Sequence, residues 1–179
     1  FAHELGVRYS EGLYKNTFIG RTFIMPGQRE RKKSLRYKLV PQELEIRDKK
    51  VMIMDDSIVR GNTSREIVKM LRDFSAREVY FASACPPVLS PCFYGVDMPT
   101  KEELIAGRMT KNEIQEYLEV DALLYQDIND LVEAVTRRGD HYIDKPCMAC
   151  LDGNYIANDI DLNTIDEIGQ MRTSYRNGN

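Results

Sequence analysis

The amino-acid sequence predicts an α/β fold with a doubly wound, mainly parallel sheet. The unbroken apolar run Val51–Met54 is typical of a strand buried on both faces. A helix is predicted from about Thr63 to Phe74, with Ile67, Met70, Leu71 and Phe74 at helical spacing, and a second β-prone run spans Val79–Ala84. Strand, helix and strand within 34 residues form a βαβ unit, which implies parallel strands and a right-handed crossover.

The segments before this unit predict a helix end and a long loop. Phe1–Leu5 has the pattern of a last helical turn that Gly6 ends. Because the chain starts with phenylalanine, we expect a processed chain or a piece of a longer one, entered partway through its first helix. The sheet is then incomplete at its N-terminal edge. The β-prone stretch Thr17–Met25 and the charged run to Lys38 are expected to form a long loop.

The segments after the unit predict three helices and one strand. Thr100–Glu103 and Thr110–Glu113 both match the capping box that begins a helix. Asp121–Tyr125 predicts a strand, and Asp127 is expected to cap a helix that Gly139 ends. We therefore expect one domain over residues 1–140 and a C-terminal segment over 141–179.

The composition is that of an ordinary globular domain. The 179 residues contain 42% hydrophobic and 30% charged residues, which argues against wholesale disorder. No apolar run approaches the roughly 20 residues that cross a bilayer, and no export signal begins the chain. Four cysteines are too few for a disulfide scaffold. We expect a cytoplasmic protein, with thiols or metal ligands rather than disulfide bonds and no membrane partner.

The charge is concentrated in one segment. The net charge of −3 divides into +7 between Lys15 and Lys38 and −10 over the rest of the chain. A basic stretch on an acidic protein indicates a polyanionic ligand, although a solvated loop would have the same composition. Nucleic acid is disfavoured because the protein is acidic overall and no helix-turn-helix or RNP signature occurs.

The candidate site is the stretch Asp55–Ser64. Asp55 and Asp56 follow the first strand, and ligands of an open parallel sheet bind at the carboxyl ends of its strands. Gly61 permits a tight turn, after which hydroxyl groups and free N–H groups of the next helix form an anion site. Carboxylates suit sugar hydroxyls or a hard cation such as Mg²⁺. The alternative is a helix cap beside two solvated acids. No Walker loop and no G-x-G-x-x-G motif occurs.

The stretch Val51–Ser64 (VMIMDDSIVRGNTS) closely resembles the phosphoribosyl pyrophosphate (PRPP) motif of type I phosphoribosyltransferases. Its DDSIVRG portion is similar to that of the glutamine PRPP amidotransferase family in particular. Gly20–Pro26, Val79–Ala84 and Tyr94–Pro99 agree with the same family. The resemblance runs from about Leu5 to Gly153 and implies the type I phosphoribosyltransferase fold.

The resemblance implies a glycosyltransferase reaction. Ammonia attacks ribose C1 of PRPP and gives 5-phosphoribosylamine and pyrophosphate, the first committed step of de novo purine (IMP) synthesis. In that family a separate N-terminal glutaminase domain with an N-terminal cysteine makes the ammonia from glutamine. No cysteine precedes Cys85, so we expect this domain to be absent here and the chain alone to be an incomplete enzyme. The family also implies homo-oligomers and inhibition by purine nucleotides.

The resemblance assigns roles to individual residues. Asp55 and Asp56 would contact the ribose hydroxyls and Mg²⁺, and residues 15–38 would form a flexible loop that folds over the pyrophosphate. The PRPP-binding set is Lys15, Arg21, Asp55, Asp56, Ser57, Ile58, Val59, Arg60, Gly61, Asn62, Thr63 and Ser64.

The cysteines suggest a metal site. By itself the pair Cys147 and Cys150 fits a zinc half-site, a redox pair, an iron–sulfur half-site or two free thiols. In amidotransferases with a [4Fe-4S] cluster, cysteines occupy positions that resemble Cys92, Cys147 and Cys150. The fourth ligand would lie upstream of Phe1.

Two other functions share the Asp55–Ser64 motif. One is a non-catalytic regulator that binds PRPP. The other is a purine or orotate phosphoribosyltransferase that uses a base in place of ammonia. The second would need a hood for the base, whereas Pro86–Pro99 resembles the amidotransferases.

Overall fold

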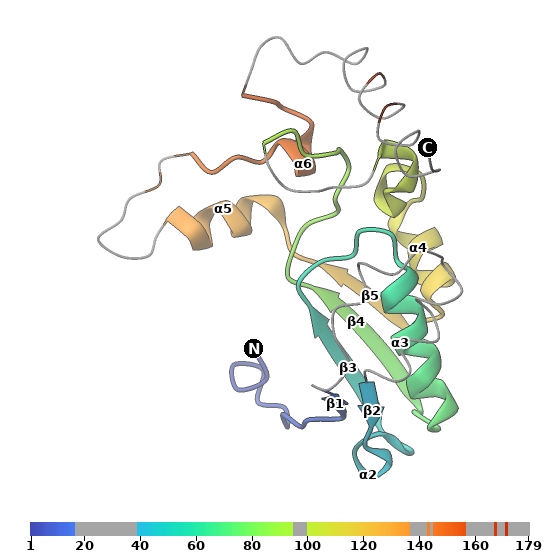
Figure 1. The fold of residues 1–179 in the computed structure, drawn as a ribbon. Coiled ribbons are helices and arrows are strands. Elements are labelled where there is room, and N and C mark those ends of the chain that lie inside the picture. The colour runs from blue at the N-terminus through green and yellow to red at the C-terminus, as the bar shows by residue number, and fades with distance from the viewer. Residues whose placement is uncertain are drawn as a thin grey trace.

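The computed structural model describes residues 1–16, 39–94, 100–136, 143, 145–156, 167 and 171. The stretch Thr17–Met25, the run to Lys38, residues 95–99, Gly139 and most of the C-terminal segment lie outside the described residues. The elements, drawn in Figure 1, are β1 (Leu13–Lys15), β2 (Leu39–Pro41), α2 (Glu43–Ile46), β3 (Lys50–Asp55), α3 (Asn62–Asp73), β4 (Glu78–Ser83), the 3₁₀ turns η2 (Lys101–Glu103) and η3 (Ile105–Gly107), α4 (Lys111–Leu118), β5 (Ala122–Tyr125), α5 (Ile128–Thr136) and α6 (Ala149–Asp152).

A three-stranded parallel sheet with the order β3-β4-β5 confirms the predicted α/β class. β3 pairs with β4 from Lys50 opposite Glu78 to Asp55 opposite Ser83. The predicted βαβ unit is therefore present, with α3 as its helix. β3 extends one residue beyond the predicted run at each end, and β4 begins and ends one residue earlier than predicted.

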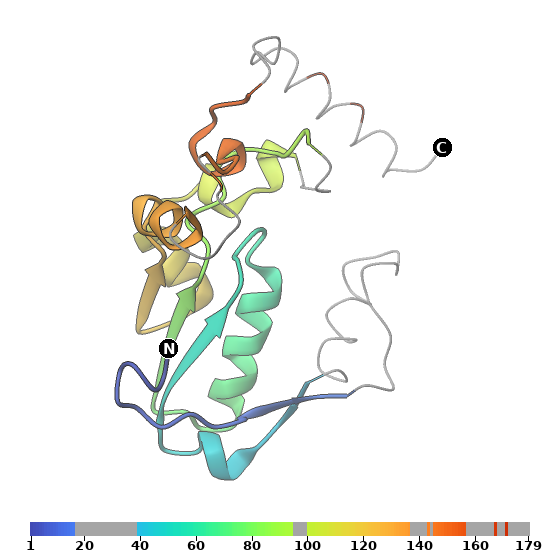
Figure 2. The same cartoon turned by 90° about the vertical axis from the view of Figure 1, so that its left-hand side faces the viewer.

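Helices α3 and α4 cover one face of the sheet (Figures 1 and 2). The predicted apolar positions Ile67, Met70 and Leu71 of α3 are buried, together with Val68. Val68 and Leu71 belong to the core cluster around Phe81, which is fully buried. Burial of a side chain of this size contributes about 2–3 kcal/mol. The apolar stripe of α3 is thus what fixes the helix on the sheet.

The opposite face of the sheet is different. Met52, Met54 and Leu124 alternate with the core-facing residues of their strands, and each is more than 40% exposed. In the strands, successive side chains point to opposite faces, so these three share the face away from α3.

The N-terminal residues form one helical turn, as the sequence predicts. The N–H of Leu5 donates to the carbonyl of Phe1 at 3.0 Å, and Gly6 ends the turn with φ 64°. The chain then enters β1, which pairs antiparallel with β2 so that Lys15 lies opposite Leu39. This two-stranded ribbon was not expected. It lies near the end of the molecule where β3 begins (Figures 1 and 2).

The two predicted capping boxes begin a 3₁₀ turn and a helix. At α4 the N–H of Glu113 donates to Thr110 Oγ1 at 3.3 Å, and the N–H of Thr110 donates to Glu113 Oε2 at 2.7 Å. At η2 the Thr100 N–H donates to Glu103 Oε2 at 3.3 Å. Asp127 caps α5 by accepting from the N–H of Asn129 at 2.8 Å. The predicted start signals are therefore confirmed.

The described part of the C-terminal segment packs on the loop after β4. Leu151 of α6 joins Val88 and Leu104 in a second apolar cluster. The N–H groups of Leu89 and Ser90 both donate to the carbonyl of Cys150, at 2.9 and 3.0 Å. α5, α6 and this loop lie beyond the carboxyl ends of the strands (Figure 1). Among the described residues, no helix is both long and apolar enough to span a membrane.

Asp121 links α3 to the start of the β4–β5 pair. These contacts predict that the stability of the fold depends on pH. Its Oδ2 accepts from the Val79 N–H at 2.6 Å and from Arg72 at 2.8 Å. The Val79 N–H, helped by Arg72, holds the pKa of Asp121 below its usual value. A lowered pKa stabilises the fold above the unfolded value of about 3.9, and that contribution is lost as the pH falls through the folded value. We expect Asp121→Asn to lower the free energy of unfolding by about 1 kcal/mol at pH 7.

The measurement is urea unfolding of the wild-type chain and the variant at several pH values. The difference between them should shrink below about pH 4. The matched control is Asp130→Asn at an exposed aspartate of α5. An equal difference at pH 3 and pH 7 would show that Asp121 acts through packing instead of charge.

Candidate functional site

The site begins where β3 ends. Asp55 is the last residue of β3 and is half-buried, whereas the next residue, Asp56, is exposed. The Asp56 N–H donates to Asp55 Oδ1 at 3.0 Å, and Ser57 Oγ donates to Asp56 Oδ1 at 3.1 Å. The main chain is held as well, since the Ala84 N–H after β4 donates to the Asp55 carbonyl at 2.9 Å. Two carboxylates are thereby fixed at the carboxyl edge of the sheet.

The surroundings of Asp55 disfavour the ionised form of its carboxyl group. Burial raises the pKa of Asp55 above its ordinary value, and the neighbouring Asp56 carboxylate adds to the rise. The hydrogen bond from the Asp56 N–H opposes it in part. A cation or a hydroxyl donor between the two carboxylates would favour the ionised form of both. The site is therefore suited to a ligand with either group.

The chain turns from the carboxylates into α3 at Gly61. Gly61 has φ 76° and ψ −9°, in the left-handed region that favours glycine, and precedes the first residue of α3. No side chain of the described residues caps this end of the helix. Thr63 is exposed and Ser64 is buried in the first turn. Backbone N–H groups at such an end, with the helix dipole behind them, bind anions.

The outer side of this turn is held by residues 103–117. Arg60 makes a two-point ion pair with Glu103, with Nε to Oε1 and Nη2 to Oε2 both at 3.2 Å. The Ile105 N–H donates to the Val59 carbonyl at 3.0 Å. Tyr117 donates its hydroxyl hydrogen to Asn62 Oδ1 at 3.2 Å. These contacts fix the loop against η2, η3 and α4.

Ten of the twelve predicted PRPP-binding residues are consecutive in the sequence, and they run from Asp55 at the end of β3 to Ser64 in the first turn of α3. Ile58 and Val59 belong to this loop through packing: Ile58 is buried in the main core, and Val59 packs on the second apolar cluster. Lys15 is an exposed residue of β1. It is the last residue of β1, whose ribbon lies near the beginning of β3, whereas the Asp55–Ser64 loop follows the end of that strand (Figure 2). Arg21 lies outside the described residues.

The three predicted cluster cysteines lie in one corner. Cys150 is in α6, and its pKa is raised by burial first, then by the Cys92 thiol, and also by the Cys147 thiol. The hydroxyl of Tyr155 donates to the Pro91 carbonyl at 2.8 Å, which holds the Cys92 loop against this segment. All four cysteines are free.

No metal centre is formed by the described side chains. Across those residues, no three histidine, cysteine, aspartate or glutamate side chains lie close enough together to hold a metal ion. This holds for the Asp55–Asp56 pair and for the cysteine corner alike.

Sequence reasoning missed the residues that hold the loop from outside. Glu103 was identified only as part of a capping box, and Ile105 and Tyr117 had no assigned role. Ion pairs between residues 43 positions apart leave no local pattern in a sequence. The Thr100–Glu103 capping box was the one signal that placed Glu103 at a helix start, where its side chain is fixed.

The fold and the loop define the class. The parallel sheet, the carboxylates after β3 and the glycine turn into α3 are those of a type I phosphoribosyltransferase, and a solved structure of this fold matches the chain. It is the glutamine PRPP amidotransferase from B. subtilis complexed with ADP and GMP, with a TM-score of 0.73 and 40% identity. The match covers 92% of this chain and 37% of that one.

The sequence relatives name the family. The amidophosphoribosyltransferase of Pseudomonas aeruginosa is 47% identical over 171 residues, 96% of this chain and 34% of that protein. The amidophosphoribosyltransferase of Methanocaldococcus jannaschii is 46% identical over 155 residues, 87% of this chain and 32% of that protein. The chain belongs to the amidophosphoribosyltransferase family and corresponds to its C-terminal region.

The chain spans about a third of the length of the curated relatives that it matches. No protein-family model matches it.

Gly61 is expected to tolerate no side chain. A Cβ there would lie 2.7 Å from Ile105 Cδ1 and 3.2 Å from Tyr117 Cε1, at a φ that other residues rarely adopt. We expect Gly61→Ala to lower the free energy of unfolding by about 1–3 kcal/mol, measured by urea denaturation.

The matched control is Gly12→Ala. A Cβ at Gly12 would meet Ile46 Cγ1 at an ordinary 3.8 Å, so stability should be unchanged or slightly higher. Similar losses in the two variants would contradict the steric argument for Gly61.

Proposed function

We propose that this chain is the PRPP-binding region of an amidophosphoribosyltransferase, which forms 5-phosphoribosylamine and pyrophosphate from PRPP and ammonia. The observation that carries the proposal is the loop Asp55–Ser64, with two carboxylates at one end and an uncapped helix N-terminus at the other. One ligand with hydroxyls and a phosphate can satisfy both ends. The family of the relatives favours ammonia over a base as the acceptor.

The two ends of the loop bind different parts of PRPP in this proposal. The backbone N–H groups at the start of α3 donate to the 5′-phosphate, and Thr63 adds a hydroxyl donor. Asp55 and Asp56 accept hydrogen bonds from the ribose hydroxyls. Burial of Asp55 supports this role, because a half-buried carboxylate gains most from donors that come with the ligand.

In the reaction, the nitrogen of ammonia forms a bond to ribose C1 as the C1–oxygen bond breaks. Pyrophosphate leaves with the electron pair, and the nitrogen loses one proton. Negative charge develops on the leaving pyrophosphate, so cationic side chains near it lower the barrier. We assign this task to the basic segment Lys15–Lys38, including Arg21, whose +7 charge suits the most highly charged part of the substrate.

Mg²⁺ is proposed as the metal of this site. The Asp55 and Asp56 carboxylates offer the oxygen ligands that Mg²⁺ prefers, and Mg²⁺ usually completes its shell with waters and substrate phosphate oxygens. Bound there, the ion would neutralise phosphate charge. A pair of carboxylates fits that mode of binding, in which the protein supplies one or two ligands.

The remaining binding partners of the protein are inferred from its relatives. The B. subtilis amidotransferase was solved with ADP and GMP bound, so we propose purine nucleotides as inhibitors of this protein too. Ammonia from a glutaminase domain and a homo-oligomeric state complete the proposal.

The test uses the longest natural polypeptide that contains these 179 residues. With PRPP, Mg²⁺ and an ammonium salt in place of glutamine, it should release pyrophosphate. Changing both carboxylates, Asp55→Asn with Asp56→Asn, should abolish Mg²⁺-dependent PRPP binding by calorimetry and reduce the rate by at least about 100-fold. The physical reason is the loss of both charges that face the ribose and the cation.

The control variant is Asp130→Asn, an exposed aspartate that changes the net charge without touching the loop. Unchanged PRPP affinity in the double Asn variant would refute the binding roles. Tight PRPP binding with no pyrophosphate release by the wild-type protein would identify a regulator in place of an enzyme.

A [4Fe-4S] cluster on Cys92, Cys147 and Cys150 is a separate proposal. It rests on the resemblance of these three positions to the cysteines of cluster-bearing amidotransferases, and the described side chains of this corner do not themselves form a metal centre. This corner lies beyond the carboxyl ends of the strands and contains none of the residues assigned to PRPP. We therefore give the cluster no part in the reaction.

We expect anaerobically purified protein to be brown and to contain iron. Cys92→Ser should remove the iron because one of the proposed thiolate ligands is lost. Cys85→Ser, a cysteine outside the proposed set, should keep it. Colourless protein that contains zinc would contradict the cluster.

A further inference from the structure

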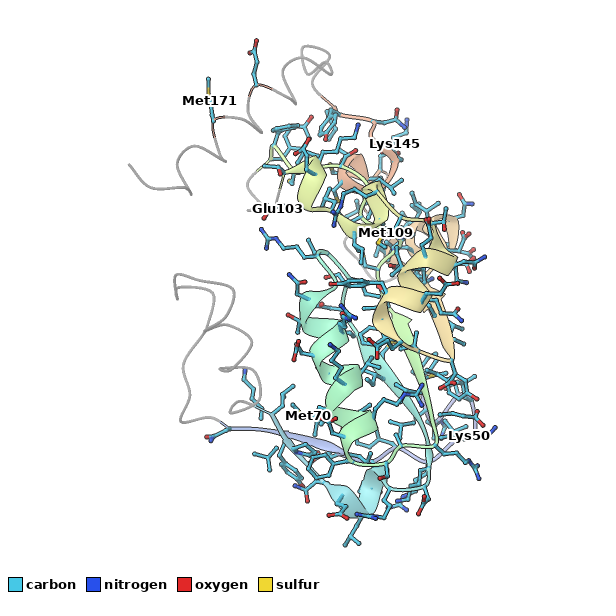
Figure 3. All side chains as sticks on the ribbon, turned by 90° about the vertical axis from the view of Figure 1, so that its right-hand side faces the viewer. Lys50, Met70, Glu103, Met109, Lys145 and Met171 are labelled. Carbon is cyan, nitrogen blue, oxygen red and sulfur yellow. The ribbon has the colours of Figure 1, made fainter. Side chains whose placement is uncertain are left out.

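Three polar contacts from outside the motif hold the outer side of the loop Asp55–Ser64. Two are the hydrogen bonds from Ile105 and Tyr117, whose side chains also close on Gly61. The third is the Arg60–Glu103 ion pair. Figure 3 places Glu103 beside the N-terminal end of α3, at the surface of the molecule.

The geometry of this ion pair is specific. The Arg60 guanidinium meets both carboxylate oxygens of Glu103 at 3.2 Å, a two-point contact that fixes its plane as well as its position. The side chains are 31% and 39% exposed, so the pair is partly shielded from water. Glu103 is itself held, because its Oε2 also accepts from the Thr100 N–H at 3.3 Å. An anchored carboxylate therefore holds the middle of the loop.

We propose that Glu103 is a positioning residue for 5′-phosphate binding, which acts through Arg60. Arg60 lies one residue before Gly61 and two before the first residue of α3. A fixed Arg60 limits the directions in which the next N–H groups point, so the phosphate finds them already oriented. The inference rests on the proposed function, because it takes the loop as the phosphate site.

The pairing also determines what Arg60 does in this arrangement. Both of its Glu103-facing nitrogens are engaged with a carboxylate, so its charge is largely neutralised before any ligand arrives. Arg60 then serves to hold the loop, and the anion is left to the N–H groups of α3. If Arg60 instead served as a phosphate ligand, Glu103 would compete with the phosphate, and its removal would tighten binding.

The experiment is calorimetry with ribose 5-phosphate, which carries the 5′-phosphate without the pyrophosphate. We expect Glu103→Ala and Glu103→Gln to raise the Kd by about three- to tenfold, because a two-point ion pair of this exposure is worth about one order of magnitude at most. The fraction of binding-competent protein, read from the stoichiometry, should stay unchanged. A merely structural residue would lower that fraction and leave the Kd as it was.

Two matched variants isolate the contact. Glu102→Ala removes the same charge from the neighbouring exposed residue and should bind as the wild-type chain does. Thr100→Val weakens the capping box and keeps the Arg60–Glu103 pair, so its Kd should also be unchanged. Glu103→Asp, which keeps the charge on a shorter side chain, should fall between wild type and Glu103→Ala.

Equal or tighter binding by the Glu103 variants, with a wild-type chain that binds, would overturn the positioning role and leave the proposed function in place. A properly folded wild-type chain that binds neither ribose 5-phosphate nor PRPP would overturn both. A rise in Kd that Thr100→Val shares would assign the effect to the cap of η2 and overturn the role of the ion pair.

Discussion

The pairing of β3 with β4 is the interaction on which the site depends. Its register, with Asp55 opposite Ser83, decides where β3 ends and therefore where the chain leaves the sheet. A slip of one residue would exchange the two faces of β3, so that Met52 and Met54 would point at α3 and Ile53 at the open face. The packing of partly buried Ile53 and fully buried Phe81 under α3 makes that slip costly. The position of the two carboxylates thus follows from the core.

From this fixed strand end, the loop is shaped by contacts on both of its sides. Inside, Ile58 is buried in the core, and outside Ile105 and Tyr117 leave no room for a side chain at Gly61. A loop enclosed in this way loses little conformational entropy when a ligand arrives, because that entropy was lost on folding. Rigidity of the phosphate end is consistent with its proposed task, since the 5′-phosphate is bound and does not react.

Most of the sheet and the loop could be predicted from the sequence. The apolar run before Asp55 and the helical spacing of Ile67, Met70 and Leu71 are local patterns, and local patterns survive in a sequence. The Arg60–Glu103 pair and the antiparallel ribbon of Lys15 with Leu39 could not be predicted, because each joins residues far apart in sequence. The N-terminal turn was predicted as well, because the glycine that ends it is a local signal. Periodicity shows where an element lies and leaves its distant partners undetermined.

The ribbon formed by β1 and β2 sets a constraint on the basic segment. Lys15 lies opposite Leu39, and the Cα atoms of paired residues in an antiparallel ladder are about 5 Å apart. The two residues that flank the segment 16–38 are therefore close together. Closing a loop of this length costs conformational entropy, and this cost grows slowly with loop length. Because the ladder already holds the two ends together, that entropy is lost on folding and not on ligand binding. The eight basic residues between Lys15 and Lys38 are thereby joined through the ribbon to the same domain as the two carboxylates.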